Sequence, residues 1–184
     1  MAVFESSGRV SSSSPEFSSA CRVVTHDGIF HADEVMATAI ISFTSKISVV
    51  RTRSPIWEDD HVDYVLDIGK TYDGIKHFDH HQHKEGVDGM ATAGLVWRTL
   101  GKTAILHYYD AVPTLLSGAD LDKVVSKVAT AMINDIDQID LGIRRPTAGE
   151  YTFSHFISGF NSNLDKDMGF VEAVNACRQA LEGL

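Results

Sequence analysis

The chain has 184 residues, a formal net charge of −9 and a hydrophobic content of 43%. This length and composition predict one domain with a buried core. The negative charge argues against an extended electrostatic grip on nucleic acid, although a few arginines and bound cations could hold a nucleotide or a strand end. No apolar run is long enough to cross a bilayer, so no membrane partner is expected.

The first part of the chain, 1–20, is polar and contains the serine-rich run "VSSSSPEFSS" without the hydrophobic segment of a secretory signal. We predict a disordered or tag-like leader there, followed by a single domain over 21–184. An organelle transit peptide stays open as an alternative. It is disfavoured because Arg9 is the only basic residue of the leader, which also contains Glu5 and Glu16.

Strand-like and helix-like patterns alternate after the leader. "CRVVTH" is a β-branched run that ends at a turn, whereas "ADEVMATAIISF" has apolar residues at helical spacing. Strands are expected at 21–26, 47–53, 62–69 and 74–81, and helices at 32–43, 92–101, 120–134 and 169–184. This alternation predicts an α/β fold with a mostly parallel sheet and helices on both faces. In such sheets, ligands bind outside the carboxyl ends of the strands.

The first polar cluster is "THDGIFHADE", which follows the first predicted strand. His26, His31 and Asp33 lie on the strand end, its turn and the start of a helix. A tight turn can direct all three side chains to one point as metal ligands. Considered alone, the cluster is equally well explained by a charge in the first helical turn and two surface histidines.

Two further clusters follow later strands. Asp67 ends the apolar run in "VLDIG", and "FDHHQH" supplies Asp79, His80 and His81 after the next strand. Adjacent histidines after a strand point in different directions, so one can bind a metal while the other faces substrate. Asp79 can fix a histidine tautomer through a ring N–H. Alone, Asp67 is also compatible with an ordinary turn aspartate.

The fourth cluster is "INDIDQID", which is expected to follow the amphipathic helix of residues 120–134. Asp135, Asp137 and Asp140 crowd a helix end, where the helix dipole disfavours negative charge. Carboxylates placed against that field suggest a compensating cation, and a solvated acidic turn is the alternative.

Together, these clusters favour a metal centre more strongly than each does alone. Histidine and aspartate ligands without thiolates favour Mn²⁺, Mg²⁺ or Co²⁺ over a structural zinc site of the cysteine type. Six or more such ligands are too many for one ion and suit a pair. Two-metal centres are typical of the hydrolysis of phosphoesters and phosphoanhydrides by an activated water.

The motifs, in this order, resemble those of the DHH phosphoesterase superfamily. More narrowly, "THDGIFHADE", "VRTRSP", "DIGKTYD", "HFDHHQ", "TAGLVW" and "IDQIDLG" resemble the amino-terminal DHH domain of the melanocyte-proliferating-gene family of metal-dependent exonucleases. The resemblance implies a five-stranded parallel sheet and two divalent cations, Mn²⁺ first and Mg²⁺ second. The metal ligands that it implies are His26, His31, Asp33, Asp67, His80 and Asp137.

The resemblance also assigns roles to individual residues. Asp67 would bridge the two ions, and His81 would contact the scissile phosphate, so both count as catalytic. Asp79 would support these histidines or complete a metal shell. Asp137 is preferred for the fourth motif and Asp140 comes next, because the spacing of the paired aspartates does not separate them.

The resemblance does not extend to a second, carboxy-terminal domain with a glycine-histidine-arginine motif, which family members usually carry and which these 184 residues lack. Polymer binding is therefore less certain than metal binding. Arg51 and Arg53 are candidate phosphate ligands, since arginine suits bidentate phosphate contacts. Arg144 and Arg145 are better explained as solvated surface charges.

The predicted function is therefore a metal-dependent phosphoesterase that hydrolyses phosphodiester bonds of RNA, short oligonucleotides or nucleotides. A pyrophosphatase-like phosphoanhydride hydrolase is one alternative, and a truncated, non-catalytic module that binds nucleotide or protein is another. A purely structural histidine-rich metal tract is the third. Cys21 and Cys177 lack C-x-x-C spacing, which favours reduced thiols and a cytoplasmic location. A homo-oligomer is compatible with these features.

Overall fold

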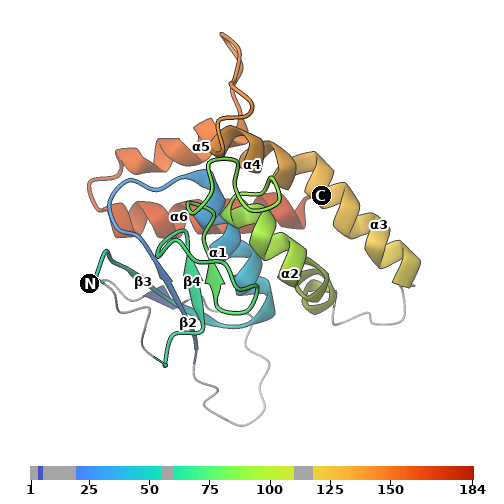
Figure 1. Cartoon of the computed structure of the whole chain (residues 1–184), viewed down its shortest axis with the longest axis horizontal. Coiled ribbons are helices and arrows are strands. Elements are labelled where there is room, and N and C mark those ends of the chain that lie inside the picture. The colour runs from blue at the N-terminus through green and yellow to red at the C-terminus, as the bar shows by residue number, and fades with distance from the viewer. Residues whose placement is uncertain (1–3, 6–19, 55–59, 110–117) are drawn as a thin grey trace.

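The computed structural model describes residues 4–5, 20–54, 60–109 and 118–184 (Figure 1). The strands are β1 (Phe4–Glu5), β2 (Cys21–Thr25), β3 (Ile47–Arg51), β4 (Tyr64–Leu66) and β5 (His77–Phe78). The helices are α1 (Ala32–Thr44), α2 (Thr92–Tyr108), α3 (Gly118–Val128), η2 (Ala129–Ile133), α4 (Asn134–Asp140), α5 (Phe153–Gly159), η3 (Phe160–Ser162) and α6 (Lys166–Glu182). None of these helices is both long and apolar enough to cross a membrane.

The strands form one sheet in the order β1-β3-β2-β4-β5. β3, β2, β4 and β5 are parallel, whereas the two-residue β1 pairs antiparallel with the edge strand β3. The α/β class and the parallel sheet are confirmed, but the parallel part has four strands and not five. The prediction for the leader stays a prediction, since most of residues 1–20 lie outside the described ranges.

The two faces of the sheet are covered differently. Alternate strand residues point to opposite faces, because side chains in a strand have a period of two. On one face, Val23, Leu66 and Phe78 join a large apolar cluster to which each α-helix also contributes. On the other face, the small cluster contains strand and loop residues, namely Val24, Val50, Val62 and Val65 with Ile68. In the described part of the chain, helices therefore cover one face, and the expectation of helices on both faces is wrong.

The connections between strands explain this one-sided arrangement. α1 joins β2 to β3, and the chain then returns past β2 to form β4 on the other side. Right-handed crossovers in opposite directions lie on opposite faces of a parallel sheet. The return connection, residues 52–63, contains no helix among its described residues, and it covers the second face with Val62. All helices after β5 pack on the first face (Figure 1).

Two helices extend beyond their predicted ends. α2 continues through Gly101 to Tyr108, because the indole ring of Trp97 packs directly against Gly101 and a side chain there would collide with it. The helix that begins at Gly118 continues through the π-helical segment Ala129–Ile133 into α4. The "INDIDQID" aspartates therefore lie within a helix and do not form a turn after it. Asp137 and Asp140 are about one helical turn apart.

Candidate metal centre

Three strand ends place the candidate ligands at one edge of the sheet. His26 follows β2, Asp67 follows β4, and Asp79 and His80 follow β5. The chain runs from β2 to β3 on one side and later to β4 on the other, so β2 and β4 flank the topological switch point. In open α/β sheets, ligand sites form outside the carboxyl ends of strands at this position.

Asp67 occupies the centre of the cluster and contacts three histidines. One carboxylate oxygen, Oδ2, lies 3.5 Å from His26 Nε2, whereas Oδ1 lies 3.4 Å from His80 Nδ1 and 3.3 Å from His81 Nδ1. Thr92 at the start of α2 donates its hydroxyl to Oδ1 at 3.1 Å. Burial alone would raise the pKa of Asp67, but contacts with these histidines hold it below its usual range. The Asp67 carboxylate therefore lies between His26 on one side and His80 and His81 on the other.

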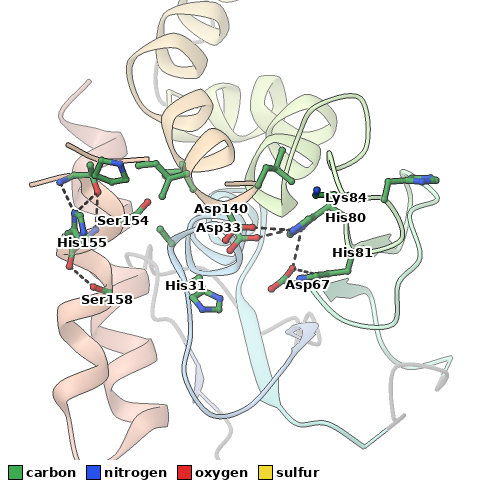
Figure 2. Close-up of a pocket in the computed structure, with 17 residues that line it drawn as sticks. His31, Asp33, Asp67, His80, His81, Lys84, Asp140, Ser154, His155 and Ser158 are labelled. Carbon is green, nitrogen blue, oxygen red and sulfur yellow. Dashed lines mark hydrogen bonds and ion pairs between the residues drawn. The ribbon is translucent and has the colours of Figure 1, made fainter. Parts of the chain in front are cut away.

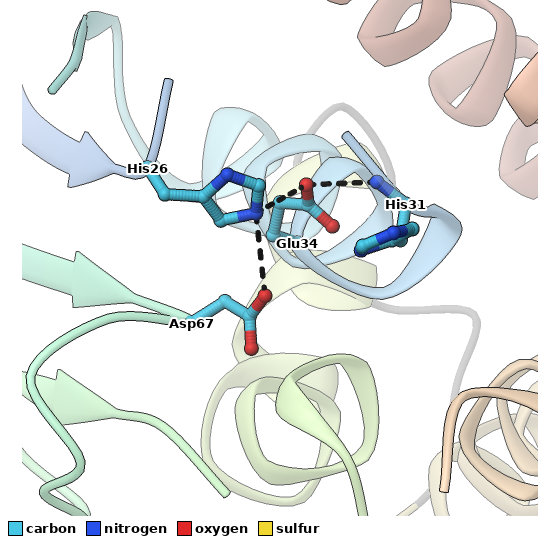
Figure 3. A group of neighbouring side chains, drawn as sticks. All are labelled: His26, His31, Glu34 and Asp67. Atoms are coloured by element: carbon cyan, nitrogen blue, oxygen red, sulfur yellow. Dashed lines mark hydrogen bonds and ion pairs between the residues drawn. The ribbon is translucent and has the colours of Figure 1, made fainter. Parts of the chain in front are cut away.

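The first motif contributes a further ligand that sequence reasoning missed, the fully buried Glu34 (Figure 3). Its Oε1 accepts the His31 backbone N–H at 2.8 Å and lies 3.1 Å from His26 Nε2. His26, His31, Glu34 and Asp67 each offer a ligand atom within 4.8 Å of the others. Although burial lowers it, contacts with Asp67 and Glu34 raise the pKa of His26 to about 10. Glu34 lies in the first turn of α1, directly after Asp33.

Asp33 is the residue whose surroundings most strongly favour a bound cation. Its side chain is completely buried, and neither carboxylate oxygen has a hydrogen-bond partner of good geometry among the described residues. The nearest histidine nitrogen, His80 Nδ1, is 3.9 Å away. Burial and the neighbouring Asp67 and Asp140 carboxylates raise its pKa well above the usual range. A buried carboxylate normally has a hydrogen-bond partner, a counter-charge or a metal ion. A divalent cation therefore fits the residues present.

The paired aspartates of α4 are separated by the structure. Asp140 lines the same cavity, with Oδ2 at 3.2 Å from His80 Nε2, and forms a group of potential ligands with His31 and Asp33. Asp137 is buried elsewhere and accepts the backbone N–H of Gly94 at 2.9 Å, in the first turn of α2. Burial raises the pKa of Asp137 to about 7. The geometry therefore favours Asp140 over Asp137 as the ligand, which reverses the sequence preference.

Gly94 is required at the point where α2 meets Asp137. A Cβ atom there would overlap the Asp137 carboxylate. We expect Gly94→Ala to lower the free energy of unfolding by about 1–3 kcal/mol, the usual cost of overpacking a core. The matched control is Gly159→Ala, because nothing lies within 4 Å of the added atom in that helical position. Urea denaturation should show the control as neutral or slightly stabilised, and equal effects would contradict this view of the Asp137 contact.

The rings of His80 and His81 stack on each other, and both direct Nδ1 towards Asp67 Oδ1, so the expectation that they point in different directions is not confirmed; they differ in exposure. The His80 side chain is buried in the cluster, whereas that of His81 is 52% exposed and lines the cavity. Asp79 holds His81 through contacts to Nδ1 at 2.8 Å and to the backbone N–H at 2.9 Å. Contacts with Asp67, against the effect of burial, raise the pKa of His81 to about 9. Asp79 thus orients His81 and does not line the cavity.

The cluster opens into a cavity of about 630 Å³ that extends to α5 (Figure 2). His31, Asp33, Asp67, His80, His81 and Asp140 line one end, and Ser154, His155 and Ser158 of α5 line the other. Lys84 also lines the cavity. It was not predicted as a site residue, although it follows the DHH motif closely. His26 and Asp137 do not line this cavity.

Neither predicted phosphate arginine lines the cavity. Arg51 is buried between Phe30 and Phe170, with its guanidinium carbon 5.3 and 4.8 Å from their ring centroids. It donates hydrogen bonds to the Gly28 carbonyl at 2.8 Å and to Asp167 at 3.1 Å. The structure therefore does not support the assignment of Arg51 to phosphate, because the side chain is buried outside the cavity and both terminal nitrogens donate to protein oxygens.

Arg53 is exposed and is also placed outside the cavity. Its Nε donates to Asp27 Oδ1 at 2.8 Å, and 72% of its side chain is accessible to solvent. The structure thus gives it an ion pair on the outer surface of the loop after β2.

The different environments of the two arginines give a stability prediction. We expect Arg51→Ala to lower the free energy of unfolding by about 2–4 kcal/mol, because it removes a buried side chain that packs between Phe30 and Phe170 and hydrogen-bonds Gly28 and Asp167. Arg53→Ala is the matched control and should change it by no more than about 0.5 kcal/mol, as is usual for an exposed ion pair. Chemical denaturation of both variants checks this, and an Arg51→Ala protein as stable as the control would contradict the structural role.

The fold and the cluster define a class of protein. It is an α/β protein with a candidate centre for divalent cations at the switch point of a parallel sheet, formed by histidine and carboxylate side chains from separate segments of the chain. No solved structure gives a significant match to this chain.

The particular family follows from the sequence comparisons. The family MYG1_exonuc, described as an uncharacterised protein family (UPF0160), matches residues 22–183, and the chain belongs to it. The MYG1 proteins of Schizosaccharomyces pombe and Saccharomyces cerevisiae are each 30% identical to it over 173 residues, covering 82% and 79% of this chain. The human MYG1 exonuclease is 31% identical over 143 residues, or 70% of this chain and 38% of its own length.

These comparisons confirm the narrower family resemblance found in the motifs. The matched region makes up 52% of the S. pombe protein and 48% of the S. cerevisiae protein, so the chain spans about half the length of these curated relatives. The names of the human and bovine relatives indicate exonucleases.

Proposed function

We propose that this chain is a metal-dependent hydrolase of the DHH superfamily that cleaves phosphodiester bonds of RNA, short oligonucleotides or nucleotides. The observation that carries the proposal is the fully buried Asp33 carboxylate, which has no hydrogen bond of good geometry among the described residues and lies beside Asp67, His80 and Asp140 at the switch point. The exonuclease names of the human and bovine relatives support the nuclease class.

The potential ligands form three overlapping groups, which suit a pair of cations. Asp67 belongs to two of them, one with His26, His31 and Glu34 and one with Asp79, His80 and His81. The third contains His31, Asp33 and Asp140, and His80 lies 3.2 Å from Asp140 and 3.9 Å from Asp33. This set of nitrogen and oxygen donors without a thiolate suits Mn²⁺, with Mg²⁺ second. When bound, such a pair of cations supplies an activated water and neutralises charge on the phosphoryl oxygens.

The protein's own side chains position the substrate. His81 stacks on His80 with ring centroids 4.2 Å apart, and Asp79 contacts its Nδ1, so the ring is held with Nε2 available to a phosphate oxygen. Lys84 adds a positive charge to the same end of the cavity. A donor fixed in advance stabilises developing charge without reorganisation at the moment of reaction.

The test is hydrolysis of a panel of substrates by the whole chain with Mn²⁺ or Mg²⁺. The panel contains end-labelled RNA, dinucleotides and pyrophosphate, with EDTA as the metal-free condition. We expect cleavage of the phosphodiesters, loss of activity in EDTA, and a large loss in His81→Ala. His107→Ala is the matched control, because His107 is an exposed histidine of α2 outside the cavity.

Other outcomes of the panel would replace this function. Cleavage of pyrophosphate without phosphodiesters would assign phosphoanhydride chemistry to the site. Metal binding without turnover of any member would favour a non-catalytic binding module.

A further inference from the structure

The cavity has two chemically different halves (Figure 2). The half at the sheet edge holds charged and metal-ligating side chains, and Lys84 lies beside His80 there. The half against α5 presents the uncharged hydroxyls of Ser154 and Ser158 beside His155, and the lining of the cavity also includes an apolar wall of Ile136, Ile139, Leu141 and Pro146. This second half is the one to which the proposed reaction assigns no role.

His155 is a fixed aromatic ring at the far end of this second half. Its Nδ1 lies 3.1 Å from Thr152 Oγ1 and accepts the Thr152 backbone N–H at 3.3 Å, which sets the orientation of the ring. The ring of Tyr151, which does not line the cavity, is roughly parallel to it, with centroids 6.0 Å apart and planes inclined by 20°. The His155 side chain is nevertheless exposed and lines the cavity. An oriented, accessible ring of this kind is a platform for another planar ring.

We propose that the α5 half of the cavity is a nucleoside subsite, in which a base stacks on His155 while its phosphate lies at the metal cluster. The proposal rests on the proposed function, since it places the phosphate at that cluster. The apolar wall suits a ribose and a base face, and the hydroxyls of Ser154 and Ser158 suit polar groups on a base edge.

The size and charge of the cavity favour a nucleotide over pyrophosphate. A volume of about 630 Å³ lies within the range of about 300–1,000 Å³ that is usual for small-molecule sites. Pyrophosphate would occupy the charged half, and no part of it would contact the α5 half. A nucleotide uses both halves, because its phosphate and its base need opposite environments.

The first test measures binding without turnover. The probe is the 2-aminopurine ribonucleoside in EDTA, whose fluorescence is quenched when its base stacks and which has no phosphate for the metal-free carboxylates to repel. We expect quenching with the wild-type chain and a dissociation constant about 5- to 150-fold weaker for His155→Ala, the effect of losing one stacked base. His155→Phe keeps an aromatic ring but loses the Thr152 contact, so it should retain most of the binding. His107→Ala is the control.

Two results of this test would overturn the subsite. One is the absence of quenching with the wild-type chain. The other is equal weakening by His155→Phe and His155→Ala, because His155 would then act only by holding Thr152 at the start of α5.

The second test separates the subsite from the proposed function. With Mn²⁺, the wild-type chain should cleave a dinucleotide about 5- to 150-fold more efficiently in kcat/KM than the same molecule lacking one base, and His155→Ala should shrink this ratio. Equal efficiencies in the wild type would overturn the subsite while leaving the hydrolase intact. Quenching that depends on His155 without any turnover would keep the subsite and overturn the hydrolase.

Discussion

Asp67→Asn is expected to reduce metal-dependent phosphodiester hydrolysis by about 10³-fold, a loss of about 4 kcal/mol of transition-state stabilisation. The reason is the position of the Asp67 carboxylate, whose two oxygens face His26 on one side and His80 and His81 on the other. An uncharged amide cannot serve both ligand groups. Titration of the variant with Mn²⁺ should also show fewer bound ions than in the wild type, and turnover assays with end-labelled RNA measure the loss.

Asparagine is the informative replacement because of the backbone at this position. Asp67 has φ of 55°, in the left-handed region that asparagine adopts more readily than most residues. Asp88 is the matched control, since it is also an aspartate with positive φ, 54°, but is exposed and pairs with Arg98 at 2.8 Å. Asp88→Asn should keep full activity. Full turnover and full Mn²⁺ binding by Asp67→Asn would show that the reaction centre lies elsewhere.

Asp140→Ala and Asp137→Ala are expected to affect different properties, activity in the first variant and stability in the second. The first should lower activity by about 10²- to 10³-fold, because it removes a charged group that contacts His80 in the cavity. It should leave the metal-free fold as stable as before, since it also relieves repulsion with Asp33. Asp137→Ala should instead lower the free energy of unfolding by about 1–3 kcal/mol, because the Gly94 N–H is left without its acceptor.

Two measurements are made on both variants. Mn²⁺-dependent turnover is measured at a temperature below the unfolding transition, and the free energy of unfolding is measured by urea denaturation in EDTA. The reverse pattern, in which Asp137→Ala retains stability but loses activity, would restore Asp137 as the ligand. Intermediate losses of both properties in both variants would show that the two aspartates act as one unit.

Much of the site could be predicted because strand ends in parallel sheets meet at one edge. The sequence patterns located β2, β4 and β5, and the polar residues directly after these strands converge in the structure. The first motif also followed from local sequence, since α1 begins at Ala32 as expected and brings Asp33 to the cluster.

The errors concern side chains whose environment is set by distant segments. Arg51 was assigned to phosphate, but its partners are Gly28 and residues of α6, which no local pattern reveals. Asp137 and Asp140 look alike in sequence, and Gly94 in α2 decides which of them turns away from the cavity. The cover of the second face of the sheet was also not visible in local sequence patterns. A loop residue, Val62, lies there, where a helix was expected.

The spread of the candidate ligands along the chain would make folding and metal binding linked equilibria. His26, Asp67, His80 and Asp140 belong to separate segments and come together only when the sheet and α4 are in place. Cations held by this cluster therefore bind the native state and not the unfolded chain. Each tenfold rise in free cation above the dissociation constant would then add about 1.4 kcal/mol per site to the free energy of unfolding. The supply of the metal would thus set the stability of the fold as well as its chemistry.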